Sequence, residues 1–290
     1  MTIFKSIPAA LLGASLLALT ACSGSTNTET NTQAPKAEAV QAPATLAEVL
    51  AHPRRAENTA RDAFRNPKET LEFFGVAPGK KVGEVWPGWY TPVIAPYLAE
   101  NGGTYVAILR QGDSERVLER NAAFTDKYVG AEGFGTIEVG KFGNEDAPIL
   151  ETGDLDVLLS FRNVHSWMRG GFGDKAFSDF YAALKPGGTL GIVQHRLPES
   201  ATQDPDGGKG YVQESYIKDM AKRAGFEFVA SSEVNANPRD TADHPFGVWT
   251  LPPASYVPKD TAEIPENFDP ELFKNIGESD RATLKFRKPL

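Results

Sequence analysis

Cysteine and long apolar runs are both scarce in this chain of 290 residues. Cys22 is the only cysteine, so no disulfide can form within the chain. The four histidines are scattered and show no H-x-x-x-H or H-x-H spacing, which argues against a metal site. A G-x-S-x-G elbow is missing, which argues against a serine hydrolase. A G-x-G-x-x-G fingerprint is also missing, which disfavours a nicotinamide-dependent oxidoreductase.

Positive charge is in deficit as well. The chain has 30 Lys and Arg against 38 Asp and Glu, a formal net charge of −8. Nucleic-acid-binding domains are usually basic, so we expect no nucleic acid among the partners.

The apolar run near the N-terminus, from Ile7 to Leu19, follows the single charge of Lys5. It is shorter than the roughly 20 residues that a permanent membrane span needs, and it is typical of a secretory signal. The run ends in Leu-Thr-Ala-Cys, which resembles the processing box of bacterial lipoproteins. That resemblance implies a signal over residues 1–21 and a lipid on Cys22; an ordinary signal with an incidental cysteine is the alternative.

The segment 22–44 is made largely of Ser, Thr, Asn, Gln, Ala and Pro, and we expect a flexible tether there. Residues 45–290 are long enough for one domain with a large core. The expected location is the periplasmic face of a bacterial membrane, with the membrane contacted only through the lipid. Ser23 slightly favours the outer membrane.

Strands and helices alternate five times in the pattern of this domain. This predicts an α/β fold with a mostly parallel sheet and helices on both faces. Between the last two strands lies a Pro-rich loop of about 47 residues with no clear helix, so we expect short elements inside it and an antiparallel last strand. The seven expected strands are 81–85, 104–109, 135–139, 154–161, 189–194, 226–234 and 282–287.

The stretch from Lys81 to Thr91, KVGEVWPGWYT, is the centre of the functional prediction. It runs from a strand through a Pro-Gly turn into a helix, the arrangement that forms the nucleotide-binding corner of doubly wound folds. The turn brings backbone close to a ligand, and the amides of the helix start point at it. Glu84, at the strand end, is a candidate to accept hydrogen bonds from a ligand amine or hydroxyl.

From about Arg54 to Pro289 the chain resembles a family of class I S-adenosylmethionine (SAM)-dependent methyltransferases that are often exported in Gram-negative bacteria. The resemblance implies a Rossmann-like fold, SAM as cofactor and a small-molecule acceptor. The segments that carry it are EVWPGWYTPVIAPYL, FRNVHSW, LKPGGTLGIVQHR, NANPRDTADHPFGVWTLPP and GESDRATLKFRKP.

The chain departs from that family at two places. Relatives have two more glycines after Gly88, so here the turn is shorter and the indole of Trp89 follows directly. Class I enzymes usually carry an acidic residue after the second strand, where this chain has Arg110. Both departures concern cofactor binding, and they leave a second hypothesis open, a non-catalytic envelope protein with a degenerate SAM site.

The candidate site residues follow the carboxyl ends of the first, second and fourth strands. Asn163 is a candidate to orient the acceptor. His165 is a candidate general base, with a hydrogen-bonded structural histidine as the alternative. His195 and Arg196 belong to the same rim, whereas His244 is expected to anchor a loop. The expected cofactor contacts are Glu84, Trp86, Pro87, Gly88, Trp89, Tyr90, Arg110, Phe161 and Arg162.

Overall fold

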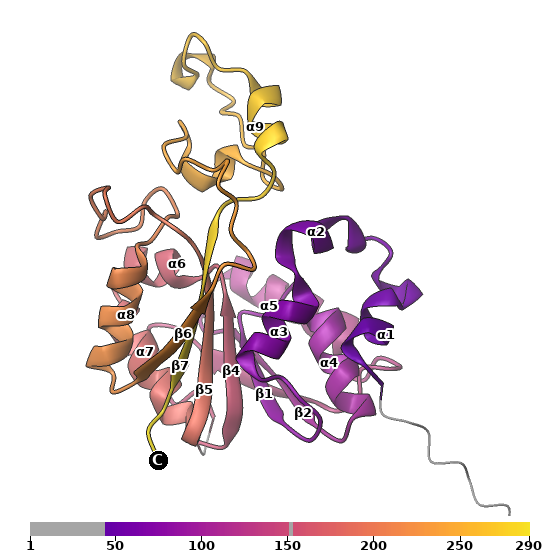
Figure 1. Ribbon diagram of the computed structural model, residues 1–290. Coiled ribbons are helices and arrows are strands. Elements are labelled where there is room, and N and C mark those ends of the chain that lie inside the picture. The colour runs from indigo at the N-terminus through magenta and orange to yellow at the C-terminus, as the bar shows by residue number, and fades with distance from the viewer. Residues whose placement is uncertain (1–43, 151–152) are drawn as a thin grey trace, which may run out of the picture. The chain divides into compact units, whose positions relative to one another are not determined.

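The seven strands form one sheet in the order β3-β2-β1-β4-β5-β7-β6 (Figure 1). Six strands are parallel to one another, and β7 is antiparallel to both of its neighbours. The computed structural model describes residues 44–150 and 153–290, which belong to one compact unit. The predicted signal, Cys22 and nearly all of the predicted tether lie outside the described residues.

The strands lie close to where the alternation of apolar segments predicted them. Their bounds are Lys81–Val85 (β1), Thr104–Arg110 (β2), Ile137–Phe142 (β3), Leu155–Phe161 (β4), Leu184–His195 (β5), Glu227–Ser232 (β6) and Arg281–Arg287 (β7). The central strands β1, β2 and β4 are almost entirely buried, as expected for parallel strands that are covered on both faces. The predicted architecture, a seven-stranded Rossmann-like sheet that is mostly parallel with an antiparallel last strand, is confirmed.

The helices cover both faces of the sheet. Helices α1, α3, α4 and α5 contribute to one apolar core, and α6, α7 and α8 contribute to the other. No helix in the described part of the chain is both long and apolar enough to cross a membrane. The α-helices are Leu46–Ala51 (α1), Asp62–Arg65 (α2), Pro67–Phe74 (α3), Thr91–Glu100 (α4), Glu115–Tyr128 (α5), Val164–Arg169 (α6), Gly173–Ala183 (α7), Glu214–Arg223 (α8) and Pro270–Ile276 (α9).

Some element bounds differ from the predicted ones for local reasons. Strand β5 begins at Leu184 rather than Thr189, because Leu184 pairs with Leu155 across an irregularity in the register. Helix α8 begins at Glu214 rather than Tyr211, because Val212 forms a bridge with Arg196. The long excursion between β6 and β7 contains short elements, as predicted: α9 and the 3₁₀ turns Gly247–Thr250 (η3) and Thr261–Glu263 (η4).

The carboxyl edge of the parallel strands is where the fold concentrates its irregular structure. In Figure 1 this edge is at the top, with α2, α6 and the yellow excursion that contains α9 beyond it. Two further 3₁₀ turns, Pro53–Arg55 (η1) and Thr59–Arg61 (η2), precede α2. Ligands of open α/β sheets bind at this edge, at the point where the strand order reverses, which here lies between β1 and β4.

Candidate active site

The two strands at the reversal point both end in a left-handed residue. Trp86 follows β1 with φ 51° and Arg162 follows β4 with φ 64°. Non-glycine residues seldom adopt this conformation, and strain of this kind concentrates at functional sites. Each residue is held by a main-chain bond to the neighbouring strand, from Trp86 N to Ile108 O and from Arg162 N to Val193 O. The backbone therefore turns sharply at the edge where a ligand is expected.

Glu84 braces the turn after β1 from behind. Its carboxylate accepts hydrogen bonds from Tyr105 Oη at 2.6 Å, from Thr91 Oγ1 at 3.3 Å and from the main-chain N–H of Gly88 at 3.3 Å. The side chain is 2% exposed, and this burial raises its pKa to about 7 despite those donors. What the structure shows for Glu84 is support of the turn; its direct contact with a cofactor stays a prediction.

The turn leaves main-chain donors at the start of α4. For the N–H groups of Trp89 and Tyr90 the described residues provide no acceptor. Both amides stand just before the first residue of the helix, where the positive end of the helix dipole lies. Such donors suit a carboxylate or another anion.

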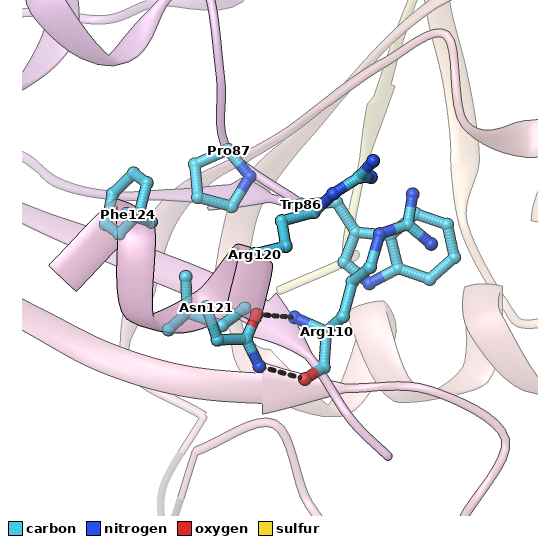
Figure 2. A pocket seen from close by; sticks show the side chains of 7 residues that line it. Trp86, Pro87, Arg110, Arg120, Asn121 and Phe124 are labelled. Atoms are coloured by element: carbon cyan, nitrogen blue, oxygen red, sulfur yellow. Dashed lines mark hydrogen bonds between the residues drawn. The ribbon is translucent and has the colours of Figure 1, made fainter. Parts of the chain in front are cut away.

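A small cavity opens beside this turn, between β1, β2 and α5 (Figure 2). Its volume is about 50 Å³, and its walls include Trp86, Pro87 and Phe124. The guanidinium of Arg110 lies over the indole of Trp86, 3.6 Å from the ring centroid. Arg110 thereby closes the cavity on one side. Asn121 fixes the main chain of Arg110 by bonds to both its N–H and its C=O. Burial and the neighbouring arginines of α5 lower the pKa of Arg110 to about 10.

Trp89 lies elsewhere than Trp86 and does not line this cavity. Its ring packs edge-on against Tyr90 and under two guanidinium groups, with Arg65 4.7 Å and Arg55 5.3 Å from the indole centroid. Tyr90 stacks on Phe161 at 3.8 Å, and burial raises the pKa of its hydroxyl to about 12. The predicted cofactor contacts thus divide into two groups: Trp86, Pro87 and Arg110 at the cavity, and Trp89, Tyr90, Phe161 and Arg162 toward β4 and α2.

His165 and Asn163 are engaged in holding the carboxyl edge together. The amide Nδ2 of Asn163 donates to Val85 O at 3.1 Å and to Ser160 Oγ at 3.3 Å, which ties the end of β1 to the end of β4. The Nδ1 atom of His165 lies 3.1 Å from Gln194 Nε2.

The hydrogen bonds of Gln194 determine which ring nitrogen of His165 carries the proton. Oε1 of Gln194 accepts from Val164 N, so Nε2 is the donor end of that amide. His165 Nδ1 is therefore an acceptor, and Nε2 carries the hydrogen. Burial, with a smaller contribution from Arg169, lowers its pKa to about 4. This arrangement favours a structural role for His165 over that of a general base, because the lone pair on Nδ1 already accepts a hydrogen bond from Gln194.

The other rim residues have structural partners too. His195 Nδ1 lies 2.5 Å from Ser279 Oγ, and burial lowers the pKa of His195 well below its usual value. Arg196 forms ion pairs with Asp280, Glu233 and Glu214. His244 contacts Asp240 at 2.8 Å inside the long excursion, as expected of a loop anchor.

The sequence position of Arg162 predicted that it lies at the site, but it did not predict which charged residues surround it. No ion pair or side-chain hydrogen bond of Arg162 is found among the described residues, and the side chain is half-buried. Burial lowers its pKa to about 9, with a further contribution from Arg65 and Arg281. Arg61, Arg65, Glu278 and Arg281 were not among the predicted site residues. The pair Arg61 and Arg65 lies at least 213 positions from the pair Glu278 and Arg281, so no local pattern indicated that they meet.

A second hollow of about 470 Å³ lies beyond α6, against the long excursion. Its walls are mostly aromatic, with Trp249, Phe246 and Tyr256 on one side and Arg169 on the other. Trp249 also packs edge-on against His165, with ring centroids 5.9 Å apart. In residues 44–150 and 153–290, no group of three or more His, Cys, Asp or Glu side chains is placed to hold a metal ion.

No family model matches the chain, and no curated protein matches it in sequence. Solved structures of similar architecture include a SAM-dependent methyltransferase from Aquifex aeolicus, with 19% identity over 66% of this chain and 94% of that one and a TM-score of 0.46. A TehB-like SAM-dependent methyltransferase from Corynebacterium glutamicum has 16% identity over 82% and 100%, with a TM-score of 0.42. A possible exported protein from Bordetella parapertussis has 15% identity over 80% and 68%, with a TM-score of 0.45. Likenesses this distant carry no argument about activity, which depends on the site itself.

Proposed function

We propose that the chain is a class I methyltransferase that takes SAM at the turn after β1 and methylates a small acceptor. The observation that carries the proposal is the strained turn at the reversal point, where left-handed Trp86 and Arg162 flank β1 and β4. A strained backbone that Glu84 and Asn163 brace from two sides is typical of a binding site rather than of a simple connector.

The residues of the turn suit the parts of SAM. The N–H groups of Trp89 and Tyr90 would hold its carboxylate, and the indole of Trp86 offers a flat surface for its adenine. When bound, SAM supplies a methyl group on a sulfonium, a strong electrophile. The transfer needs little more than alignment and exclusion of water, so a dedicated base among the rim residues is not required.

The size of the cavity is the observation that favours the second candidate, a non-catalytic protein of the same fold. Sites for drug-sized ligands usually enclose about 300–1,000 Å³, and the hollow beside Trp86 has about 50 Å³. Arg110 occupies the space above the indole. The enzyme hypothesis therefore requires the Arg110 side chain to leave the indole when SAM binds.

Calorimetric titration of the purified protein with SAM separates the two candidates. For the enzyme we expect saturable binding at micromolar concentration, and for Arg110→Ala binding at least as tight, because the substitution removes the group above Trp86. Arg116→Ala is the matched control, since it removes an equal charge from an exposed position on α5. Absence of heat at millimolar SAM with both wild type and Arg110→Ala would leave only the non-catalytic candidate.

Insertion of two glycines after Gly88 gives a second, independent comparison. If the short turn has weakened an ancestral SAM site, the lengthened turn should bind SAM more tightly than wild type. Equal affinity in the two proteins would show that the length of the turn does not limit binding.

Export and lipid anchoring are part of the same proposal. They are supported by the apolar run 7–19 and by the Leu-Thr-Ala-Cys sequence that ends at Cys22. Labelled palmitate should enter the wild-type protein in bacterial cells and should not enter Cys22→Ser. Incorporation into both proteins, or into neither, would contradict the anchor.

A further inference from the structure

Four arginines from three separate segments gather at the carboxyl edge near one carboxylate, that of Glu278. Arg61 Nε donates to Glu278 Oε1 at 2.6 Å, and Arg65 Nε donates to Oε2 at 3.0 Å. Arg281 Nη2 also donates to Glu278 Oε2. Arg162 completes this arginine cluster from the end of β4, where its pKa responds to the charges of the other three arginines and of Glu278.

The arginine cluster holds more buried hydrogen-bond donors than the described residues provide acceptors for. Arg65 is 1% exposed and Arg281 is 2% exposed. Arg65 Nη1, Arg65 Nη2, Arg281 Nε and Arg61 Nη2 are all shielded and find no acceptor in the described part of the chain. The indole Nε1 of Trp89, which lies under Arg65, is in the same condition. Buried polar groups are nearly always paired in native proteins, so five buried N–H groups without a partner in one region indicate that an acceptor binds there.

The arginine cluster also has more positive than negative charge, which again suits an anion. Three guanidinium groups contact the single carboxylate of Glu278. The fourth, that of Arg162, interacts electrostatically with Glu278 and with Glu84, whose pKa is raised to about 7. The nearby carboxylate of Asp62 does not offset this excess, because it is paired with Arg55 at 2.6 Å. The neighbouring His195 is kept neutral by burial and by these arginines. The cluster therefore keeps an excess of at least two positive charges.

The arginine cluster stands beside the turn that we assign to the cofactor. Arg65 covers the indole of Trp89, and Tyr90 Oη donates to the main-chain carbonyl of Arg65 at 2.9 Å. In Figure 1, α2, which contains Arg65, lies past the upper ends of the strands, as does the chain that leads into β7. Arg61 and Arg162 are half-buried, so the cluster reaches solvent through these two side chains.

We propose that the arginine cluster binds a small oxyanion group with two negative charges, as in a phosphate monoester or a dicarboxylate, and that this group is the recognised part of the methyl acceptor. Guanidinium groups bind both kinds of anion through paired N–H donors. The four guanidinium groups, less the charge of Glu278, leave three positive charges, which is enough to hold a group with two negative charges. The assignment to the acceptor rests on the proposed methyltransferase function; the anion site itself does not.

Titration of the full-length protein with inorganic phosphate and with malonate, at constant ionic strength set with sodium chloride, tests the site without SAM. We expect saturable binding of at least one anion, and the stronger of the two identifies the class. Arg162→Gln should weaken that binding by about tenfold or more, because Arg162 reaches solvent and has no ion-pair partner in residues 44–150 and 153–290. Arg223→Gln is the matched control, since Arg223 is exposed on α8 and pairs with Asp174, and it should bind as wild type does.

Two results overturn the anion site: no saturable binding of either anion, or equal binding by Arg162→Gln and Arg223→Gln. A SAM titration in the presence of saturating phosphate then tests the assignment to the acceptor. We expect the SAM affinity to stay within about twofold if the two ligands occupy separate sites that share no binding side chain. Competition would assign the cluster to the carboxylate of SAM and overturn the acceptor. A protein that binds phosphate but not SAM would lose the methyltransferase function and keep the oxyanion site.

Discussion

Glu84 and Glu278 are buried to the same degree, 2% and 3% exposed, yet their pKa values move in opposite directions. At the turn after β1, burial outweighs the donors of Tyr105 and Thr91 and raises the pKa of Glu84 to about 7. In the arginine cluster, burial alone would raise the pKa of Glu278, but Arg281, Arg65 and Arg61 lower it to about 2. Burial alone therefore does not decide the charge of a carboxyl group; burial, nearby charges and hydrogen-bond donors decide it together.

The comparison also separates two kinds of site on one sheet edge. The turn is held by neutral donors, and its cavity is closed by an arginine stacked on an indole. The arginine cluster has excess charge and donors without acceptors. The first region needs a side chain to move before it can bind a ligand, whereas the second has binding groups in place and needs a matching anion.

Among the substitutions considered, removal of the Glu278 charge should lower the free energy of unfolding the most. Glu278→Gln leaves Arg61, Arg65 and Arg281 without their shared carboxylate, and we expect a loss of about 3–5 kcal/mol in the free energy of unfolding at pH 7. Urea unfolding followed by circular dichroism measures it. Glu227→Gln is the control, because Glu227 pairs with Arg287 at an exposed position and should lose no more than about 1 kcal/mol. Similar losses in both variants would show that Glu278 is not a buried counter-ion.

The pH dependence of stability should have opposite signs at the two carboxyl groups. For Glu278 the folded pKa lies below 4.5, so its contribution is present above pH 4.5 and is lost as pH falls toward about 2. For Glu84 the folded pKa lies above 4.5, so its contribution is present below pH 4.5 and is lost as pH rises through about 7.

The Glu84→Gln variant isolates the second of these slopes. Between pH 4.5 and 8 we expect wild type to lose on the order of 1–3 kcal/mol more than Glu84→Gln, because the glutamine stays neutral. Unfolding free energies across this range provide the measurement. Parallel curves for the two proteins would mean that the pKa of Glu84 in the folded state is not raised above its value in the unfolded chain.

Loss of the hydrogen bonds that join the ends of β1 and β4 should lower the free energy of unfolding by a smaller amount. Asn163 joins Val85 of β1 to Ser160 of β4 through one amide. Asn163→Ala removes both hydrogen bonds and should lower the free energy of unfolding by about 1–2 kcal/mol. Ser160→Ala, which removes only the longer of the two, is the matched comparison and should have the smaller effect. A larger loss for Ser160→Ala than for Asn163→Ala would show that Ser160, and not Asn163, holds the two strand ends together.

The stacking of Arg110 on Trp86 should give the smallest change in stability. A cation–π contact at a partly exposed site contributes about 0.5–1 kcal/mol, so Arg110→Ala should lose no more than that. Thermal unfolding of Arg110→Ala beside the exposed control Arg116→Ala measures the difference. A loss of several kcal/mol would show that Arg110 is a structural element rather than a movable cover.

The fold was predictable from the sequence because its signals are local. Apolar runs such as 154–161 and turn sequences such as Lys185–Gly188 predicted the order of strands and helices. The lack of a clear helical sequence pattern between the last two predicted strands predicted the antiparallel last strand. The element bounds were less predictable. Pairing between distant segments, such as Leu184 with Leu155, extended β5 beyond what local pattern indicated.

The candidate site was predictable only in part. The motif around Glu84 and the position of Arg162 both followed from the ends of predicted strands, and both lie at the reversal point. The tautomer of His165 was not accessible from sequence, because it depends on Gln194, 29 positions away. A neutral histidine with an occupied lone pair and a free catalytic histidine have the same local sequence.

By itself, the sequence determined the class of the fold, the order of its elements and the edge where a ligand belongs, because these depend on patterns within a few residues. Only the tertiary structure decided which charges meet. Arg61 and Glu278 are 217 positions apart, and their contact follows from the way α2 and the start of β7 come together at the carboxyl edge. Charge interactions act through space over a few ångströms, so no pattern along the chain reveals them.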